Sequence, residues 1–149
     1  MKAVTLWQPW ATWIALGWKT IETRTHDRMK CLFGETIAIH AGLHWDEDAI
    51  EMARRWLTNE QIADTLKMRR RHTRLKRHFV HPTGIVCTTS VWSYGWLGAG
   101  DSAAALCDCS GNDLFGLVLD EIRAINPPIP VSGSQGIWEW TPPDSVPAV

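Results

Sequence analysis

Three charged side chains of both signs follow a glycine near the start of the chain, in the stretch GWKTIETR. Lys19 is a mobile cation that suits a phosphate or a proton transfer, and Arg24 offers a planar fork of donors that matches phosphate geometry. Glu22 can orient either cation or accept a proton from a base amine or a sugar hydroxyl. Such a mixed set in one cleft suits a nucleotide. The alternative is a surface ion pair of Glu22 with Arg24, worth ~0.2–1 kcal/mol, beside a solvated Lys19.

A second concentration of charge lies in the segment 67–81, which reads KMRRRHTRLKRHFVH. It carries +7 and no acidic residue, so the rest of the chain carries −8 within the total of −1. This asymmetry predicts one surface that suits polyanions. A solvated lid and an arm that docks on an acidic protein are the alternatives. The basic side chains are Lys67, Arg69, Arg70, Arg71, Arg74, Lys76 and Arg77.

Length and composition predict one globular domain. A chain of 149 residues with 45% hydrophobic residues can bury one core. No apolar run approaches the ~18 residues of a membrane span and no signal peptide is visible, so we expect a cytoplasmic protein without a membrane partner. Most of the ten tryptophans should fill the core, with one or two left to stack on bases. The oligomeric state is not predicted.

Cysteine and histidine spacing gives no metal or cofactor expectation. Four cysteines are few for a disulfide scaffold, and we expect reduced thiols. Cys107 and Cys109 are separated by one residue rather than by the two to four of structural zinc sites, and no second pair follows. His72, His78 and His81 lie among arginines, which would repel a metal cation.

Hydrophobic patterning predicts the elements that must position these charges. Gln8-Pro9-Trp10 begins a helix that ends at Gly17, and the alternation of residues 19–25 predicts a strand with Thr20, Glu22 and Arg24 on one face. Further strands are expected over residues 3–6, 35–40, 84–92, 114–125 and 136–140, with a loop over 94–112 and a break at Pro127, Pro128 and Pro130. Further helices are expected after Asp46-Glu47-Asp48, and after the capping box of Thr58 and Gln61.

The second of these helices carries the basic residues. Ile62 and Leu66 should anchor its first half, and Leu75 with Phe79 its end, while Arg69 to Thr73 is polar all round. Short strands with two or three helices and no βαβ rhythm predict the α+β class, as a small, mostly antiparallel β-barrel. We expect one domain over 1–141 with an inserted basic helical segment around 58–80, followed by a tail over 142–149.

The chain resembles the ASCH domain family of the PUA-like superfamily. The resemblance rests on LWQPWATWIALGWKTIETR, with the pattern G-x-K-x-x-E-x-R at Gly17, Lys19, Glu22 and Arg24, and on IHA at 39–41, FGLVLDEI at 115–122 and PIPVSGSQGIW at 128–138. It implies a PUA-like barrel whose cleft is lined by the G-x-K-x-x-E-x-R residues, in a family linked to RNA metabolism.

Two activities are implied for relatives in this superfamily. One branch removes the acetyl group from acetylated cytidine with a threonine three residues after the lysine, but this chain has Glu22 there, which counts against that activity. Other relatives are described as ribonucleases. A metal-free ribonuclease here would use Lys19 and Arg24 with one of Glu22, His40 or Tyr94. Whether the protein is an enzyme is left open.

The hypothesis is therefore an RNA- or other nucleic-acid-binding protein, with single-stranded RNA favoured. Lys19 and Arg24 would bind phosphate, Trp10 would stack on a base, and the basic helix would extend the contact. A nucleoside amidohydrolase and a protein-interaction adaptor remain alternatives. Ser132 and Ser134 replace the lysines of some relatives in the closing turn, which weakens phosphate binding there. The remaining candidate contacts are Gln8, His40, Ser134 and Gln135.

Overall fold

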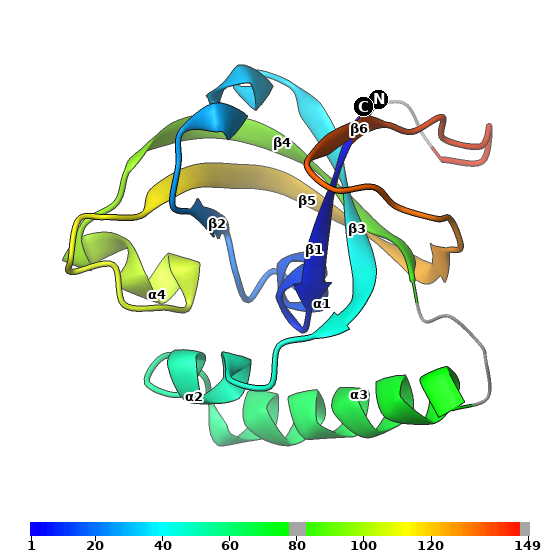
Figure 1. Ribbon diagram of the computed structural model, residues 1–149, viewed down its shortest axis with the longest axis horizontal. Coiled ribbons are helices and arrows are strands. Elements are labelled where there is room, and N and C mark those ends of the chain that lie inside the picture. The colour runs from blue at the N-terminus through cyan, green and yellow to red at the C-terminus, as the bar shows by residue number, and fades with distance from the viewer. Residues whose placement is uncertain (78–82, 147–149) are drawn as a thin grey trace.

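The computed structural model describes residues 1–77 and 83–146, and its strands form one mixed sheet that curls into a half-barrel (Figure 1). The strands are β1 Lys2–Gln8, β2 Ile21–Arg24, β3 Thr36–Trp45, β4 Gly84–Trp96, β5 Phe115–Ile129 and β6 Ile137–Glu139. The α-helices are α1 Trp10–Ala15, α2 Ala49–Ala53, α3 Asn59–Arg77 and α4 Ser102–Ala105, with 3₁₀ turns η1 Arg28–Leu32 and η2 Ala99–Asp101.

The strand order is β2-β5-β4-β3-β1-β6, so β2 and β6 are the two edges. Every pairing is antiparallel except that of β1 with β3. This confirms the predicted α+β class with a mostly antiparallel, barrel-like sheet. Because β6 pairs with β1, the first strand of the chain lies against the last one. None of the helices in the described ranges is both long and apolar enough to cross a membrane.

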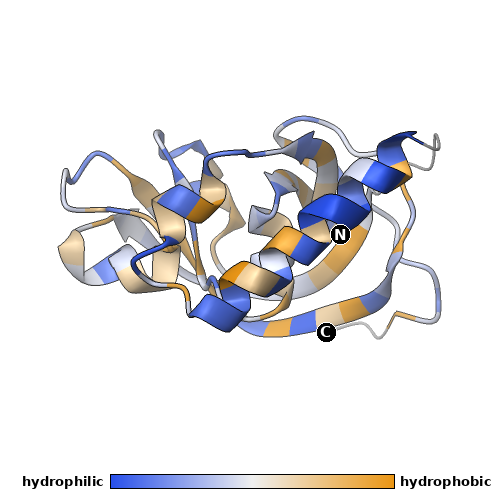
Figure 2. Cartoon of the chain, turned by 90° about the horizontal axis from the view of Figure 1, so that it is seen from below, coloured by the Kyte–Doolittle hydropathy of each residue, from blue (hydrophilic) through white to orange (hydrophobic). Residues whose placement is uncertain are grey.

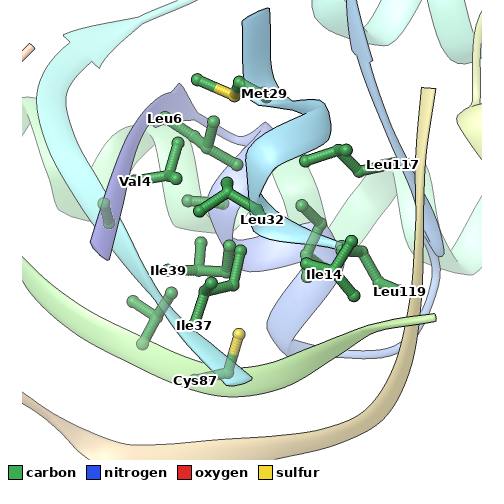
Figure 3. Packing of buried hydrophobic residues seen from close by; sticks show 14 of the residues in the cluster. Val4, Leu6, Ile14, Met29, Leu32, Ile37, Ile39, Cys87, Leu117 and Leu119 are labelled. Atoms are coloured by element: carbon green, nitrogen blue, oxygen red, sulfur yellow. The ribbon is translucent and has the colours of Figure 1, made fainter. Parts of the chain in front are cut away.

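The main core fills the inner face of the half-barrel (Figure 3). Alternate residues of each strand point to the same face, and these inward positions are aliphatic in β1, β3 and β5. Residues from elements that are not part of the sheet complete this core: Ile14 of α1, and Met29 and Leu32 of η1. The inward strand residues include Val4, Leu6, Ile37, Ile39, Leu117 and Leu119.

The N-terminal helix forms as its sequence predicts. Trp13 and Ile14 are fully buried and Gly17 ends the helix with a φ of 73°, a left-handed conformation that costs glycine little. The side-chain Oε1 of Gln8 accepts hydrogen bonds from the backbone N (3.2 Å) and the Oγ1 (2.8 Å) of Thr12. Gln8 therefore binds the first turn of α1.

The basic helix α3 begins at the predicted capping box but is anchored by other residues. Thr58 and Gln61 exchange hydrogen bonds of 2.9 and 3.1 Å, as predicted. Leu66 is 40% exposed, so its prediction as an anchor is wrong, and Phe79 lies outside the described residues.

The buried positions of α3 are two polar residues. Thr65 accepts a hydrogen bond of 3.0 Å from Trp13 Nε1, and His72 Nε2 donates one of 3.0 Å to the carbonyl of Leu43. The segment 69–73 is therefore not polar and solvated all round, because an imidazole can be buried where its N–H finds a carbonyl. Figure 2, which views the molecule from below, shows α3 running diagonally across the front, with a strongly hydrophilic C-terminal half.

Three elements run beyond their predicted ends. β3 continues to Trp45 and β4 to Trp96. The predicted loop over 94–112 contains the short helix α4, so the described residues form four α-helices rather than two or three. β5 continues through Pro127 and Pro128, although these prolines predict a break. β2 pairs only with the first four residues of β5, so the missing N–H groups of the prolines cost no hydrogen bond to β2.

We predict that Thr65→Val lowers the free energy of unfolding by ~1–3 kcal/mol. The substitution keeps the shape but leaves the buried Trp13 N–H without an acceptor. Urea unfolding measures the effect, and Thr73→Val, at an exposed position of the same helix, is the matched control. Equal stabilities for the two variants would contradict the anchoring role of Thr65.

Candidate functional site

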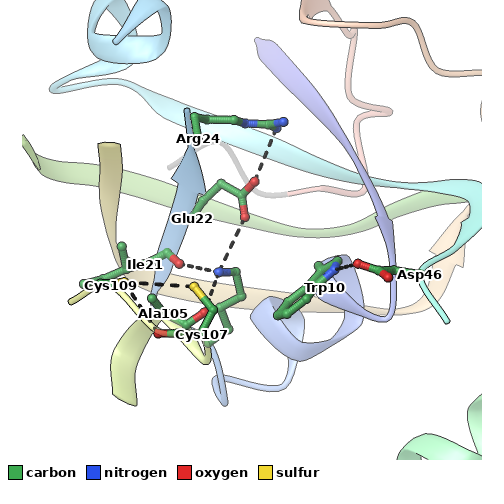
Figure 4. A network of polar contacts seen from close by, with 9 residues as sticks. Trp10, Ile21, Glu22, Arg24, Asp46, Ala105, Cys107 and Cys109 are labelled. Atoms are coloured by element: carbon green, nitrogen blue, oxygen red, sulfur yellow. Dashed lines mark hydrogen bonds and ion pairs between the residues drawn. The ribbon is translucent and has the colours of Figure 1, made fainter. Parts of the chain in front are cut away.

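Lys19 is the most buried charged residue among the described residues, with 1% of its surface exposed. Its Nζ donates hydrogen bonds to the carbonyl oxygens of Ile21 (2.6 Å) and Ala105 (2.8 Å). Glu22 Oε2 lies 3.8 Å from the same nitrogen (Figure 4). The three protons of the ammonium therefore each face an oxygen, and the alternative of a solvated lysine is wrong.

Glu22 joins this buried lysine to Arg24. Its other oxygen, Oε1, lies 3.3 Å from Arg24 Nη2, and the side chain is 10% exposed. Arg24 is 27% exposed, and its Nε is buried without a hydrogen-bond partner in the described part of the protein. Lys19, Glu22 and Arg24 thus form one chain of charges, defined here as the charge chain, that runs from the interior towards the surface. This is not a solvated surface pair.

Burial sets the protonation behaviour of the charge chain. Desolvation lowers the pKa of Lys19, because the charged form loses its water. The carboxylate of Glu22 opposes this effect, as would the thiolate forms of Cys107 and Cys109, and Arg24 adds to it. The two sulfur atoms lie 4.0 Å apart, and burial raises the pKa of Cys109 to about 11, so this thiol is protonated at neutral pH.

A cavity of ≈ 340 Å³, the first cavity, is lined by all three members of the charge chain. Trp10 lies on its wall, with its ring centroid 5.3 Å from Lys19 Nζ and its Nε1 donating a 2.8 Å hydrogen bond to Asp46. Sequence reasoning did not find the other polar and aromatic members of this wall, because they come from separate elements without a shared spacing. The lining residues it missed are Thr5, Leu6, Trp7, Thr23, Asp46, Met52 and Cys107.

A larger cavity of ≈ 870 Å³, the second cavity, adjoins the first. Thr5, Trp7 and Arg24 line both. His26 and the cationic Arg28 lie on its wall, and the segment 132–136 also lines it, so the predicted residues Ser134 and Gln135 do lie at the site.

His40 lies on the wall of the second cavity and is 2% exposed. Its Nε2 is 3.0 Å from the carbonyl of Val131, which can only accept, so Nε2 carries the proton and Nδ1 is an acceptor. Burial lowers the pKa of His40 more than this hydrogen bond raises it, so the ring is neutral at neutral pH. Nδ1 is buried without a partner in the described residues, and the ring packs directly on Gly133, where no side chain would fit.

The remaining predicted contacts lie elsewhere. Gln8 and Arg71 line a third cavity of ≈ 380 Å³ between α3 and the end of β5, and Arg69 forms an ion pair with Glu47. No basic residue of α3 lines the first or second cavity. Tyr94, the third candidate proton donor, is exposed on β4 and lines neither. The structure therefore separates the charge chain from the basic helix.

We predict that the stability difference between the wild type and Lys19→Met grows with pH. The pKa of Lys19 is lowered in the folded protein and is near 10.5 in the unfolded chain, so between these values the unfolded state binds more protons. The free energy of unfolding of the wild type, relative to that of the variant, should then rise with pH up to about 10.5. Urea unfolding at a series of pH values tests this, and parallel profiles would contradict it.

Comparison with known proteins supports the fold. No family model matches the sequence, and neither does any curated protein. Among solved structures, the crystal structure of ASCH from Zymomonas mobilis matches with a TM-score of 0.53 and 10% sequence identity, over 94% of this chain and 87% of that one. At this identity the likeness concerns the fold alone. It agrees with the resemblance seen in the sequence, and the chain has an ASCH-type fold.

Proposed function

We propose that the protein binds single-stranded RNA, with one base in the first cavity and the adjoining phosphates along the second. The observation that supports this most directly is the charge chain, which is buried at one end and reaches the junction of the two cavities at Arg24. Ion pairs that only stabilise the fold have no need to line a cavity, whereas the charge chain lines the first cavity together with Trp7 and Trp10.

The first cavity has the size and chemistry for one base. Its ≈ 340 Å³ falls in the range of small-ligand sites, ~300–1,000 Å³. Trp7 and Trp10 provide aromatic walls, on which a base can stack irrespective of its identity. The carboxylates of Glu22 and Asp46 can accept hydrogen bonds from base N–H groups. A base of a duplex would first have to leave its stack, which favours a single strand.

The second cavity suits the phosphates that flank this base. Arg24, His26 and Arg28 line it, and none of its lining residues within the described ranges is acidic. Arg24 is 27% exposed where it lines this cavity, so the exposed part of its guanidinium can donate charge-assisted hydrogen bonds to a phosphate oxygen. Because Arg24 also lines the first cavity, one side chain would contact both parts of a nucleotide.

Binding fits the site better than hydrolysis. All three protons of Lys19 face oxygens, so it is suited to position Glu22 rather than to take up a proton. Both oxygens of Glu22 face cations, which makes its carboxylate a poor nucleophile in place of the threonine of acetylcytidine hydrolases. We therefore propose binding roles for Lys19, Glu22 and Arg24.

We predict that Arg24→Gln weakens binding of a fluorescently labelled single-stranded RNA by about tenfold or more. A charge-assisted hydrogen bond contributes ~1.5–3 kcal/mol, and the glutamine cannot replace its charge. Fluorescence anisotropy measures the dissociation constant. Arg54→Gln, which breaks an exposed ion pair on α2, is the matched control and should change nothing beyond its small effect on net charge. Equal affinity of both variants would refute the site.

The basic helix would then contact the RNA backbone outside the two cavities. Arg70 and Arg74 are exposed on α3, and no ion pair is formed by either within the described residues. We predict that Arg70→Gln with Arg74→Gln flattens the plot of log K against log salt by about two units, because two fewer counterions are released. An unchanged slope would leave α3 outside the RNA contact and favour a protein partner for it.

A further inference from the structure

Three aromatic side chains lie exposed side by side at the end of β4, and we call them the aromatic edge. Phe33, Tyr94 and Trp96 are 56%, 45% and 60% exposed. Phe33 meets Tyr94 at a centroid distance of 5.5 Å, and Tyr94 and Trp96 both pack on the buried Phe115, at 5.8 and 5.6 Å. The core thus holds the rings in place without covering them.

Strand register places the aromatic edge next to the charge chain. Arg24 is opposite Phe115, and Phe115 is opposite Trp96. Glu22 is opposite Leu117 in the same way, and Leu117 is opposite Tyr94. Directly opposed residues share a sheet face, and neighbouring strands are ~4.8 Å apart, so the Cα atoms of Arg24 and Trp96 are about 10 Å apart on one face.

The 3₁₀ turn η1 connects the second cavity with the aromatic edge. Arg28 and Met29, at its start, line the second cavity, and Phe33 follows its last residue. Lys30 lies between them and is exposed, where it pairs with Asp27 at 2.9 Å. The surface from the second cavity to the rings therefore carries Arg28 and Lys30, with Asp27 paired to Lys30.

We propose that the aromatic edge is a second base-stacking subsite for the same single-stranded RNA. This rests on the proposed function. About 10 Å corresponds to roughly three stacking steps of ~3.4 Å each, so in a strand with its first base in the first cavity, the fourth and later bases reach the rings. Aromatic side chains beside a basic border suit this ligand, because every base has a face that can stack and every linkage is anionic.

The geometry favours bases over an apolar protein surface. Phe33 is inclined at 71° to Tyr94, and Trp96 at 81° to Phe115, so the rings form separate faces rather than one flat patch. Trp92 is also exposed, at 68%, but it lies at the irregularity between Val91 and Ser93. No ring contact joins Trp92 to the aromatic edge among the described residues, so it serves as a control.

The test compares two RNA lengths, an unlabelled trinucleotide by calorimetric titration and a labelled twelve-nucleotide oligouridine by fluorescence anisotropy. The variant is Tyr94→Ala with Trp96→Ala. A stacked base is worth roughly 5- to 150-fold in affinity, so the long RNA should bind at least about tenfold more weakly. The trinucleotide, which fills only the cavities, should bind within about twofold of the wild type.

Two control variants separate stacking from structure. Tyr94→Phe with Trp96→Phe keeps a ring at each position and should retain most of the affinity for the long RNA, and Trp92→Ala should retain all of it. Undiminished binding of the long RNA by the alanine variant would overturn the subsite, and so would an equal loss for the trinucleotide. If the wild type binds both RNAs equally, the proposed function stands and the subsite falls. If it binds neither, both fall.

Discussion

The site depends on how the protein buries one ammonium group. Moving a charged lysine out of water costs several kcal/mol unless hydrogen bonds and an opposite charge replace the lost hydration. The carbonyl of Ile21 comes from β2, the carbonyl of Ala105 from α4, and the carboxylate from Glu22. Lys19 therefore joins β2 to α4 beside the first cavity, together with the backbone hydrogen bond from Thr20 N to the carbonyl of Ala104. Because Glu22 is held by Lys19, Arg24 is held at the junction of the two cavities.

This arrangement explains why an ion-pair chain can belong to a binding site. A guanidinium that has one side fixed by a carboxylate loses little conformational freedom when a phosphate binds the other side. The same principle applies to His40, whose ring is fixed by the carbonyl of Val131 and by the close approach of Gly133. In the proposed function, preformed donors and acceptors of this kind would select a ligand by geometry, while the exposed arginines of α3 would offer charge without a fixed shape.

Local sequence patterns predicted the parts of the molecule that depend on neighbouring residues. Alternation put Glu22 and Arg24 on one face of β2, the capping box located the start of α3, and Gly17 ended α1. The fold class followed from the absence of a βαβ rhythm and from the resemblance to ASCH proteins, and the structure confirms both at the level of the fold.

What sequence patterns could not predict depends on distant elements meeting. Asp46 and Met52 reach the first cavity only because β3 runs on to Trp45 and α2 follows it. His72 is surrounded by arginines in the sequence, and only the carbonyl of Leu43, 29 residues away, explains its burial. One fold can host many functions, so the role proposed for the residues around the cavities rests on their chemistry rather than on pattern or fold.

The pairing of β6 with β1 has a consequence for the order in which the site is completed during synthesis. β1 is made before the strands that it pairs with, whereas the turn that closes the second cavity over His40 is made after β5 and directly before β6. A nascent chain can assemble the charge chain from its own earlier segments and still lack this wall. The second cavity is thus completed only once the segment that leads into β6 has been made and β6 can pair with β1.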